Sequence, residues 1–155
     1  MNLTFLHLTL VHIPILFVPL AVLLLILALL KSNQTLKATS LALFILSGVF
    51  VVPAFLLGEE AEESVEDIAV VNKHDIKEHE ESADFAVWLT VALGVLAIGQ
   101  VATEKFKPDS SKHFTIPLIV LGIVSSASLS YTAWEGGKIR HPEAHSQEKS
   151  VKEDS

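Results

Sequence analysis

Long stretches without Asp, Glu, Lys or Arg dominate the pattern of hydrophobic and polar positions along this chain. They cover residues 1–30, 38–58, 85–103 and 114–134. A helix of about 20 apolar residues crosses the roughly 30 Å of hydrocarbon in a bilayer. Each stretch meets or nearly meets that length, so the pattern predicts four membrane-spanning helices. We place them at residues 10–30, 38–57, 85–102 and 114–134.

The predicted fold class is an all-α integral membrane four-helix bundle, formed by a single domain at residues 1–145. Half of the 155 residues are hydrophobic and the mean hydropathy is +0.50. A soluble domain of this size would show shorter apolar runs broken by charge. Residues 58–84 form an acidic insert between the second and third spans, and we expect it to be partly helical, with the third helix beginning near Asp75. The charged tail at residues 146–155 is predicted to be disordered. The N-terminus lacks the basic region of a cleavable signal peptide.

Charge is distributed unevenly between the two ends of the predicted bundle. With four spans, both termini and the acidic insert lie on one side. The two short loops on the other side carry five lysines against two acids, whereas the termini and insert carry six Lys and Arg residues against sixteen acids. The density of lysine in short loops favours a cytoplasmic location for them and extracytoplasmic termini. No basic patch indicates nucleic acid as a partner, and the absence of cysteine excludes thiolate metal sites.

Histidine is concentrated on the acidic side. Six of the seven lie there under this topology, namely His7, His12, His74, His79, His141 and His145, with His113 on the other side. A histidine at a membrane interface is by default a solvated residue, and we assign His7, His74, His113 and His145 to that class. His12, His79 and His141 each adjoin the end of an apolar helix, where they could converge. We expect the double glycine at residues 136–137 to break the last helix and turn the chain back, bringing His141 and Glu143 to the surface.

Carboxylates accompany these histidines at helical spacing. Glu59, Glu62 and Glu63 follow the second span and share one helix face, where like charges repel unless a cation lies among them. Asp75 precedes His79 by one turn, so its carboxylate could fix the tautomer of that histidine. The predicted metal ligands are His12, Glu59, Glu62, Glu63, His79 and His141, with Asp75 and Glu143 as supporting groups.

Several of these residues stand in motifs that resemble a bacterial family of four-span membrane proteins of unknown function. VHIPI at residues 11–15 resembles its V-H-F-P-I motif, with isoleucine in place of the usual aromatic residue. GEEAEE at residues 58–63 resembles G-E-x-A-E-E, and His79, Glu80 and Ala83 match an H-E-x-x-A stretch. GGKIRHPE at residues 136–143 matches G-G-x-I-R-H-P-E, and it is the most specific of the four. The resemblance implies the bacterial inner membrane as the location and the same residues as the site, and it implies no activity.

Three functions are compatible with this pattern, and no residue pattern specifies a reaction. The first is a non-haem metal site of Zn, Fe, Mn or Ni at the extracytoplasmic end of the bundle, structural or redox-linked. The second is a b-type haem held by two of His12, His79 and His141 for membrane electron transfer. The third is an accessory subunit without a cofactor. Apart from the bilayer, the partners that these functions would require are another copy of the chain or a membrane redox protein. Transport is disfavoured because the centres of the spans carry no ionisable residue.

Overall fold

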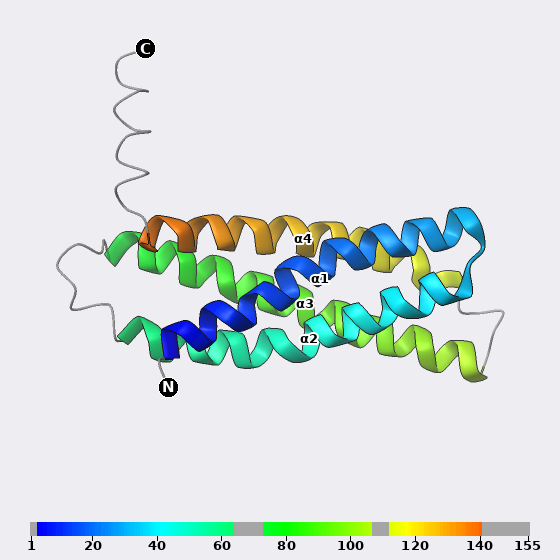
Figure 1. The fold of residues 1–155 in the computed structure, drawn as a ribbon, viewed down its shortest axis with the longest axis horizontal. Coiled ribbons are helices and arrows are strands. Elements are labelled where there is room, and N and C mark those ends of the chain that lie inside the picture. Colours follow the sequence, from blue (N-terminus) through cyan, green and yellow to red (C-terminus); the bar gives the residue numbers. More distant parts are fainter. Residues whose placement is uncertain (1–2, 64–72, 107–111, 141–155) are drawn as a thin grey trace, which may run out of the picture.

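The computed structural model describes the backbone of residues 3–63, 73–106 and 112–140, with the side chains of residues 3–60, 73–106 and 114–139. These residues form four antiparallel helices, all long and apolar enough to cross a membrane (Figure 1). They are α1 (Leu3–Lys31), α2 (Gln34–Glu63), α3 (Lys73–Phe106) and α4 (Lys112–Arg140). The predicted all-α four-helix membrane bundle is therefore confirmed.

The helices continue past the apolar stretches, mainly at the end that carries the acidic residues and most of the histidines. We call this the histidine end. There α2 continues into the acidic insert as far as Glu63, and α3 begins in it at Lys73, twelve residues before the uncharged stretch starts at Phe85. At a rise of about 1.5 Å per residue, this extension carries the start of α3 roughly 18 Å beyond Phe85. The predicted partly helical insert is therefore confirmed at both of its edges.

One local prediction is wrong. The double glycine at Gly136 and Gly137 does not break α4, which continues to Arg140, and neither glycine has a positive φ. Glycine costs a helix only about 1 kcal/mol relative to alanine, and tertiary packing of a helix readily outweighs that amount. The His79 ring covers Gly136 and Lys138 forms an ion pair with Glu135, so this turn is held in place by its neighbours.

Each helix packs against two neighbours in a square arrangement. α1 lies between α2 and α4, and α3 also lies between α2 and α4, so α1 and α3 occupy opposite corners. A short connection at Ser32 and Asn33 joins α1 to α2. Ser32 has a positive φ of 49°, and the Asn33 side chain caps α2 by accepting a hydrogen bond of 3.1 Å from the Leu36 amide.

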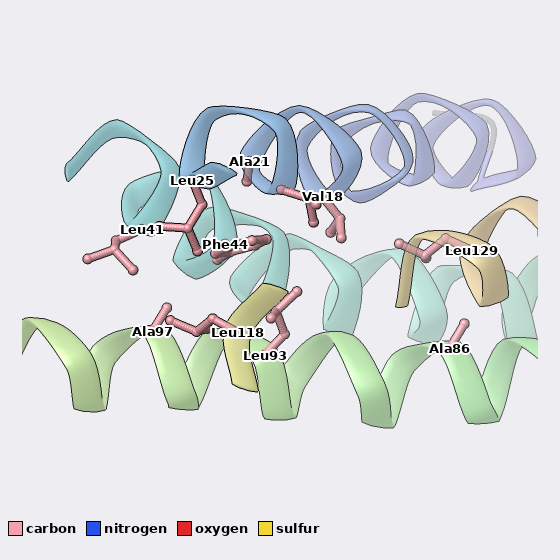
Figure 2. Packing of buried hydrophobic residues seen from close by; sticks show 11 residues of the cluster. Val18, Ala21, Leu25, Leu41, Phe44, Ala86, Leu93, Ala97, Leu118 and Leu129 are labelled. Atoms are coloured by element: carbon pink, nitrogen blue, oxygen red, sulfur yellow. The ribbon is translucent and has the colours of Figure 1, made fainter. Parts of the chain in front are cut away.

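The core follows the bundle axis and contains side chains from all four helices (Figure 2). Phe44, Leu93 and Leu118 are fully buried at its centre. Two buried hydroxyl groups pair across the core, where those of Thr90 and Ser125 lie 2.9 Å apart between α3 and α4. A bilayer gives helices little hydrophobic reason to associate, so this close packing must supply much of the stability.

The two helical hairpins, α1–α2 and α3–α4, are built on the same plan. Every buried residue of α1 corresponds to a buried residue of α3 at a constant spacing of 72 positions, as from Pro14 to Ala86. The pairs are Pro14 and Ala86, Val18 and Thr90, Ala21 and Leu93, Val22 and Gly94, Leu25 and Ala97, and Ala28 and Gln100. This correspondence is expected of two equivalent hairpins related by an approximate two-fold rotation about the bundle axis.

The second helices of the hairpins correspond in the same way. Four buried positions of α2 match buried positions of α4 at a constant spacing of 78, as from Ser40 to Leu118. The pairs are Ser40 and Leu118, Phe44 and Gly122, Ser47 and Ser125, and Val51 and Leu129. The chain therefore contains an internal structural repeat, and a feature of one hairpin can be compared with its counterpart in the other.

α2 and α3 approach most closely where Gly48 faces Gly94. A methyl group added to Gly94 would lie 3.2 Å from the Gly48 Cα, and it would press on backbone that cannot move aside cheaply. We expect Gly94→Ala to lower the free energy of unfolding by about 1–3 kcal/mol, measured in detergent solution. Gly99→Ala is the matched control in the same helix, because its methyl group would meet only the Phe114 ring at 3.6 Å. Equal stability of the two variants would contradict this packing argument.

Candidate histidine site

His7 of α1 is held against α2 at the histidine end of the bundle. Its Nδ1 lies 2.7 Å from the carbonyl oxygen of Ala54, and the ring is half-buried. The ring also lies against Gly58, where an added methyl group would be only 2.9 Å from the His7 Cε1. The glycine therefore provides the space that this ring occupies, one turn after the carbonyl that orients it.

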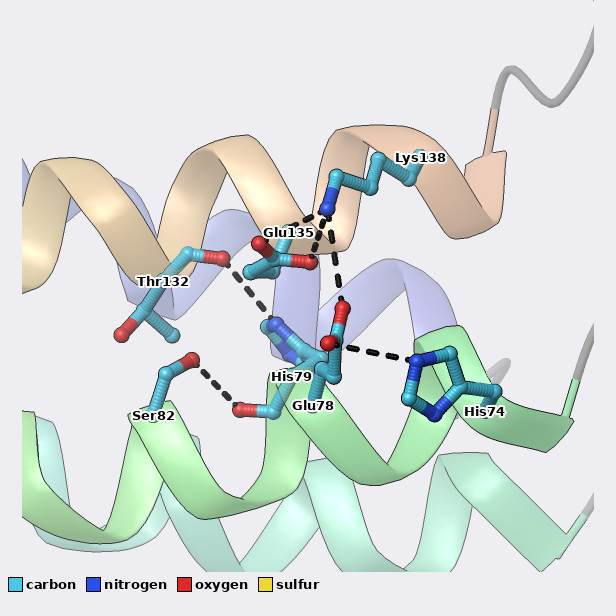
Figure 3. A network of polar contacts seen from close by, with 7 residues as sticks. All are labelled: His74, Glu78, His79, Ser82, Thr132, Glu135 and Lys138. Atoms are coloured by element: carbon cyan, nitrogen blue, oxygen red, sulfur yellow. Dashed lines mark hydrogen bonds and ion pairs between the residues drawn. The ribbon is translucent and has the colours of Figure 1, made fainter. Parts of the chain in front are cut away.

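His79 of α3 repeats this arrangement against α4. Its Nδ1 lies 3.0 Å from the carbonyl oxygen of Thr132, and a methyl group on Gly136 would be 3.1 Å from its Cε1 (Figure 3). His7 and His79 are separated by the same 72 positions as the buried residues of α1 and α3. Their partners also follow the repeat, because Ala54 and Thr132, like Gly58 and Gly136, are 78 positions apart. The two histidines are thus equivalent residues of the two hairpins.

The hydrogen bonds fix the tautomer of both imidazole rings. A carbonyl oxygen can only accept, so Nδ1 carries the hydrogen in each histidine, and in the neutral ring Nε2 keeps its lone pair. The two rings belong to helices at opposite corners of the bundle and lie at the same end of it. An imidazole whose Nδ1–H is held by a carbonyl group is the usual form of a histidine that binds a metal through Nε2.

A charged cluster adjoins His79 (Figure 3). Glu135 of α4 is fully buried, and the Lys138 Nζ lies 2.8 Å from its Oε1 and 2.7 Å from its Oε2. The same Nζ lies 3.9 Å from the centre of the Trp134 ring and 3.7 Å from the Glu78 Oε2. His79 and Glu135 also interact through their charges. A buried carboxylate is costly unless a cation compensates it, and Lys138 is that cation here.

The outer part of this cluster belongs to α3 alone. His74 and Glu78 are one turn apart, and the His74 Nε2 lies 3.3 Å from the Glu78 Oε1. Glu78 therefore stands between His74 and Lys138, and its side chain is 40% exposed.

The structure describes the side chains of some of the residues predicted to form the site. Among those with described side chains, His79 lies in the half-buried position given above. His12 and Glu59 are exposed, and the His12 Nδ1 contacts the carbonyl oxygen of Leu8 in its own helix. Asp75 is half-exposed in the first turn of α3. The contact that the structure gives the His12 ring is thus with its own helix.

The remaining predicted residues lie outside the described side chains. Glu62 and Glu63 belong to the last turn of α2, and His141 and Glu143 follow the last residue of α4. Within the described ranges, no group of three or more His, Asp or Glu side chains is arranged to hold a metal ion. The pair formed by His7 and His79 is thus the centre of the candidate site.

The opposite end of the bundle has a different character. A half-open cavity of about 410 Å³ lies there among the end of α1, the start of α2 and α4, with Ala28, Lys37 and Thr115 in its lining. Lys37 forms an ion pair with Glu104 of α3. None of the described residues that line this cavity is a histidine.

Sequence reasoning missed the two residues that the structure makes most informative. His7 was assigned to the solvated class, and Glu135 was not among the predicted site residues. A search for repeats would have aligned His7 with His79 and Gly58 with Gly136. His7 and His12 are five residues apart, which corresponds to about 140° of rotation around the helix. The two side chains therefore leave α1 in different directions, and this difference decides which of them meets α2.

The fold and the histidine end together define the class of this protein: a four-span α-helical membrane protein with two equivalent histidines, each packed against a glycine of the next helix, at one end of its bundle. A family model described as "Predicted membrane protein (DUF2231)" matches residues 4–143, which is nearly the whole chain, and the chain belongs to that family. No curated protein and no solved structure matches the chain. The resemblance stated from the sequence motifs is thereby confirmed.

Proposed function

We propose that this membrane protein binds a transition-metal centre through the Nε2 atoms of His7 and His79. The observation that carries the proposal is the matched orientation of the two rings, each with its Nδ1 held by a carbonyl oxygen of the neighbouring helix. Both imidazoles then present a lone pair without further rearrangement of the hydrogen bonds. Gly58 and Gly136 support the same geometry, since any larger residue would displace the rings.

Imidazole nitrogen suits Zn, Fe and Ni, and the neighbouring carboxylates extend the range to Mn. Two imidazoles leave coordination positions open. Water or the oxygen atoms of nearby acids would fill them in a non-haem site, for which Glu62, Glu63 and His141 of the sequence-based prediction remain candidates. Such a centre supplies a Lewis acid or, with iron, one-electron transfer. The role of this chain is to hold the donors in the correct tautomer at the membrane surface.

Haem iron is the second candidate for the same donors. Its axial ligands come from two sides of the ring, and His7 and His79 belong to helices at opposite corners of the bundle. The fully buried Glu135 close to His79 favours the non-haem ion, because a carboxylate is a ligand for such an ion and a poor neighbour for an apolar haem face. We therefore rank the non-haem site first.

We also propose that the histidine end faces away from the cytoplasm in a bacterial inner membrane. Lys31, Lys37 and Lys105 lie at the opposite end of the helices, as the positive-inside rule requires of the cytoplasmic side. His79 lies six residues before the uncharged stretch of α3, about 9 Å outside it. The site would thus lie in the interfacial region, accessible to metal ions from the aqueous phase.

The test compares two double variants of the purified protein. We expect His7→Ala/His79→Ala to lose the bound metal, and His12→Ala/His74→Ala to retain it, measured by elemental analysis after purification without chelators. The second variant removes the same number of histidines from exposed positions at the same end of the bundle. A Soret band in the wild-type spectrum identifies haem iron, and stoichiometric metal without that band identifies the non-haem site.

Two results would contradict the proposal. One is a wild-type protein that contains no metal and takes up none from solution, which leaves the accessory subunit as the remaining function. The other is equal metal content in wild type and His7→Ala/His79→Ala.

A further inference from the structure

We propose that Lys138 is an internal cation that holds the Glu135 carboxylate in the metal-free protein and yields it to the bound metal as a third ligand. This inference rests on the proposed metal site of His7 and His79 in its non-haem form. Among the described residues no group of three His, Asp or Glu side chains is arranged to hold a metal ion, but a fully buried carboxylate, Glu135, precedes the glycine that lies against the His79 ring.

Glu135 is placed to serve the same site as His79. Glu135 immediately precedes Gly136, whose backbone lies against the His79 ring. The charge of the Glu135 carboxylate interacts with that ring. The Glu135 side chain has no exposed surface; the Lys138 ammonium group lies beside both oxygens, and the Tyr131 hydroxyl also hydrogen-bonds the carboxylate, which offers about four acceptor positions in all. The carboxylate therefore retains acceptor capacity inside the protein.

A buried carboxylate requires a positive charge nearby, and that requirement can be met by an ammonium group or by a metal ion. In this structure Lys138 meets it through both carboxylate oxygens. A divalent ion at the two imidazoles would compete with Lys138 for Glu135, because the two cations repel each other at short range. Binding of the metal should therefore release Lys138 from Glu135.

A second carboxylate is already in position to receive Lys138. The Glu78 Oε2 lies 3.7 Å from the Lys138 Nζ, on the more exposed side of the cluster (Figure 3). The other oxygen of Glu78 contacts His74, which fixes the direction of the carboxylate. Lys138 can thus exchange Glu135 for Glu78 by a small rotation of its side chain, without leaving its ion-paired state.

Comparison of the two hairpins shows that the pair formed by Glu135 and Lys138 is present in the second one only. The residues equivalent to Glu135 and Lys138, 78 positions earlier, are Leu57 and Glu60. The first hairpin therefore contributes an imidazole alone, whereas the second contributes an imidazole, a carboxylate and the cation that occupies it. One site on the bundle axis would then have two equivalent nitrogen donors and a single oxygen donor from the described residues.

The experiment measures Zn²⁺ affinity of the purified full-length protein by competition with a colorimetric chelator. We expect Lys138→Met to bind Zn²⁺ at least about tenfold more tightly than wild type, because the competing cation is gone. Glu135→Gln should bind at least about tenfold more weakly, because an amide is a poor ligand. Lys77→Met and Glu81→Gln are the controls, since they break a similar but exposed ion pair on α3, and both should match wild type.

The rise in thermal unfolding temperature on adding Zn²⁺ is a second measurement, which is valid even if Lys138→Met is less stable without metal. We expect that rise to be larger in Lys138→Met than in wild type. Unchanged or weaker Zn²⁺ binding by Lys138→Met, while His7→Ala/His79→Ala loses binding, would overturn the inference and leave the proposed metal site intact. Wild-type binding by His7→Ala/His79→Ala would overturn the metal site itself.

Discussion

Lys138→Met is expected to lower the free energy of unfolding of the metal-free protein by about 3–5 kcal/mol, the usual cost of leaving a buried charge without its partner. Glu135 has no exposed surface, and Lys138 is the cation that contacts both of its oxygens. The loss of the ammonium group over the Trp134 ring adds to the effect. Chemical unfolding in mild detergent with added chelator measures the change.

The double variant Glu135→Leu/Lys138→Met separates this explanation from a general intolerance of substitution. Leucine is the residue that the first hairpin carries at the equivalent position, Leu57, so its shape is suited to this place in the bundle. Replacement of a buried ion pair by apolar residues is often neutral or stabilising. We therefore expect the double variant to recover most of the stability lost in Lys138→Met. A double variant as unstable as the single one would show that the pair is needed for more than charge compensation.

Phe44→Ala is expected to have the second largest effect on stability, a loss of roughly 3 kcal/mol, near the lower end for phenylalanine in a protein core. Phe44 is fully buried at the centre of the bundle, and its ring closes the space in front of Gly122, the equivalent residue in the second hairpin. The large side chain of one hairpin thus fills the volume left by the absent side chain of the other. Removing it would leave a cavity that the lipid cannot fill.

Phe5→Ala provides the matched control for Phe44→Ala. Phe5 lies in α1, and its side chain is 69% exposed. Loss of an exposed apolar side chain should change the stability by less than about 1 kcal/mol. Unfolding of both variants in the same detergent gives the comparison, and equal losses would contradict the packing assigned to Phe44.

The histidine site illustrates how far the sequence could predict function. The gathering of histidine and acidic residues at one end of the bundle follows from topology, and His79 was among the residues selected for the site. The choice of His12 over His7 is not supported by the geometry, because both residues adjoin the same end of α1 and only one side of that helix faces α2. Glu135 was not selected, because the two glycines that follow it predicted the end of the helix at that point.

The pattern of residues along the chain was enough to determine the four helices, their order and the membrane as their surroundings. Such features depend on local properties, since the length of an uncharged run and the cost of charge in hydrocarbon are read from each segment separately. The tertiary structure alone decided which donors meet. Whether an imidazole faces the bundle axis depends on the rotation of its helix against the neighbouring helices. That rotation is set by contacts between residues far apart in the chain, such as those of Gly58 with His7 and of Gly136 with His79.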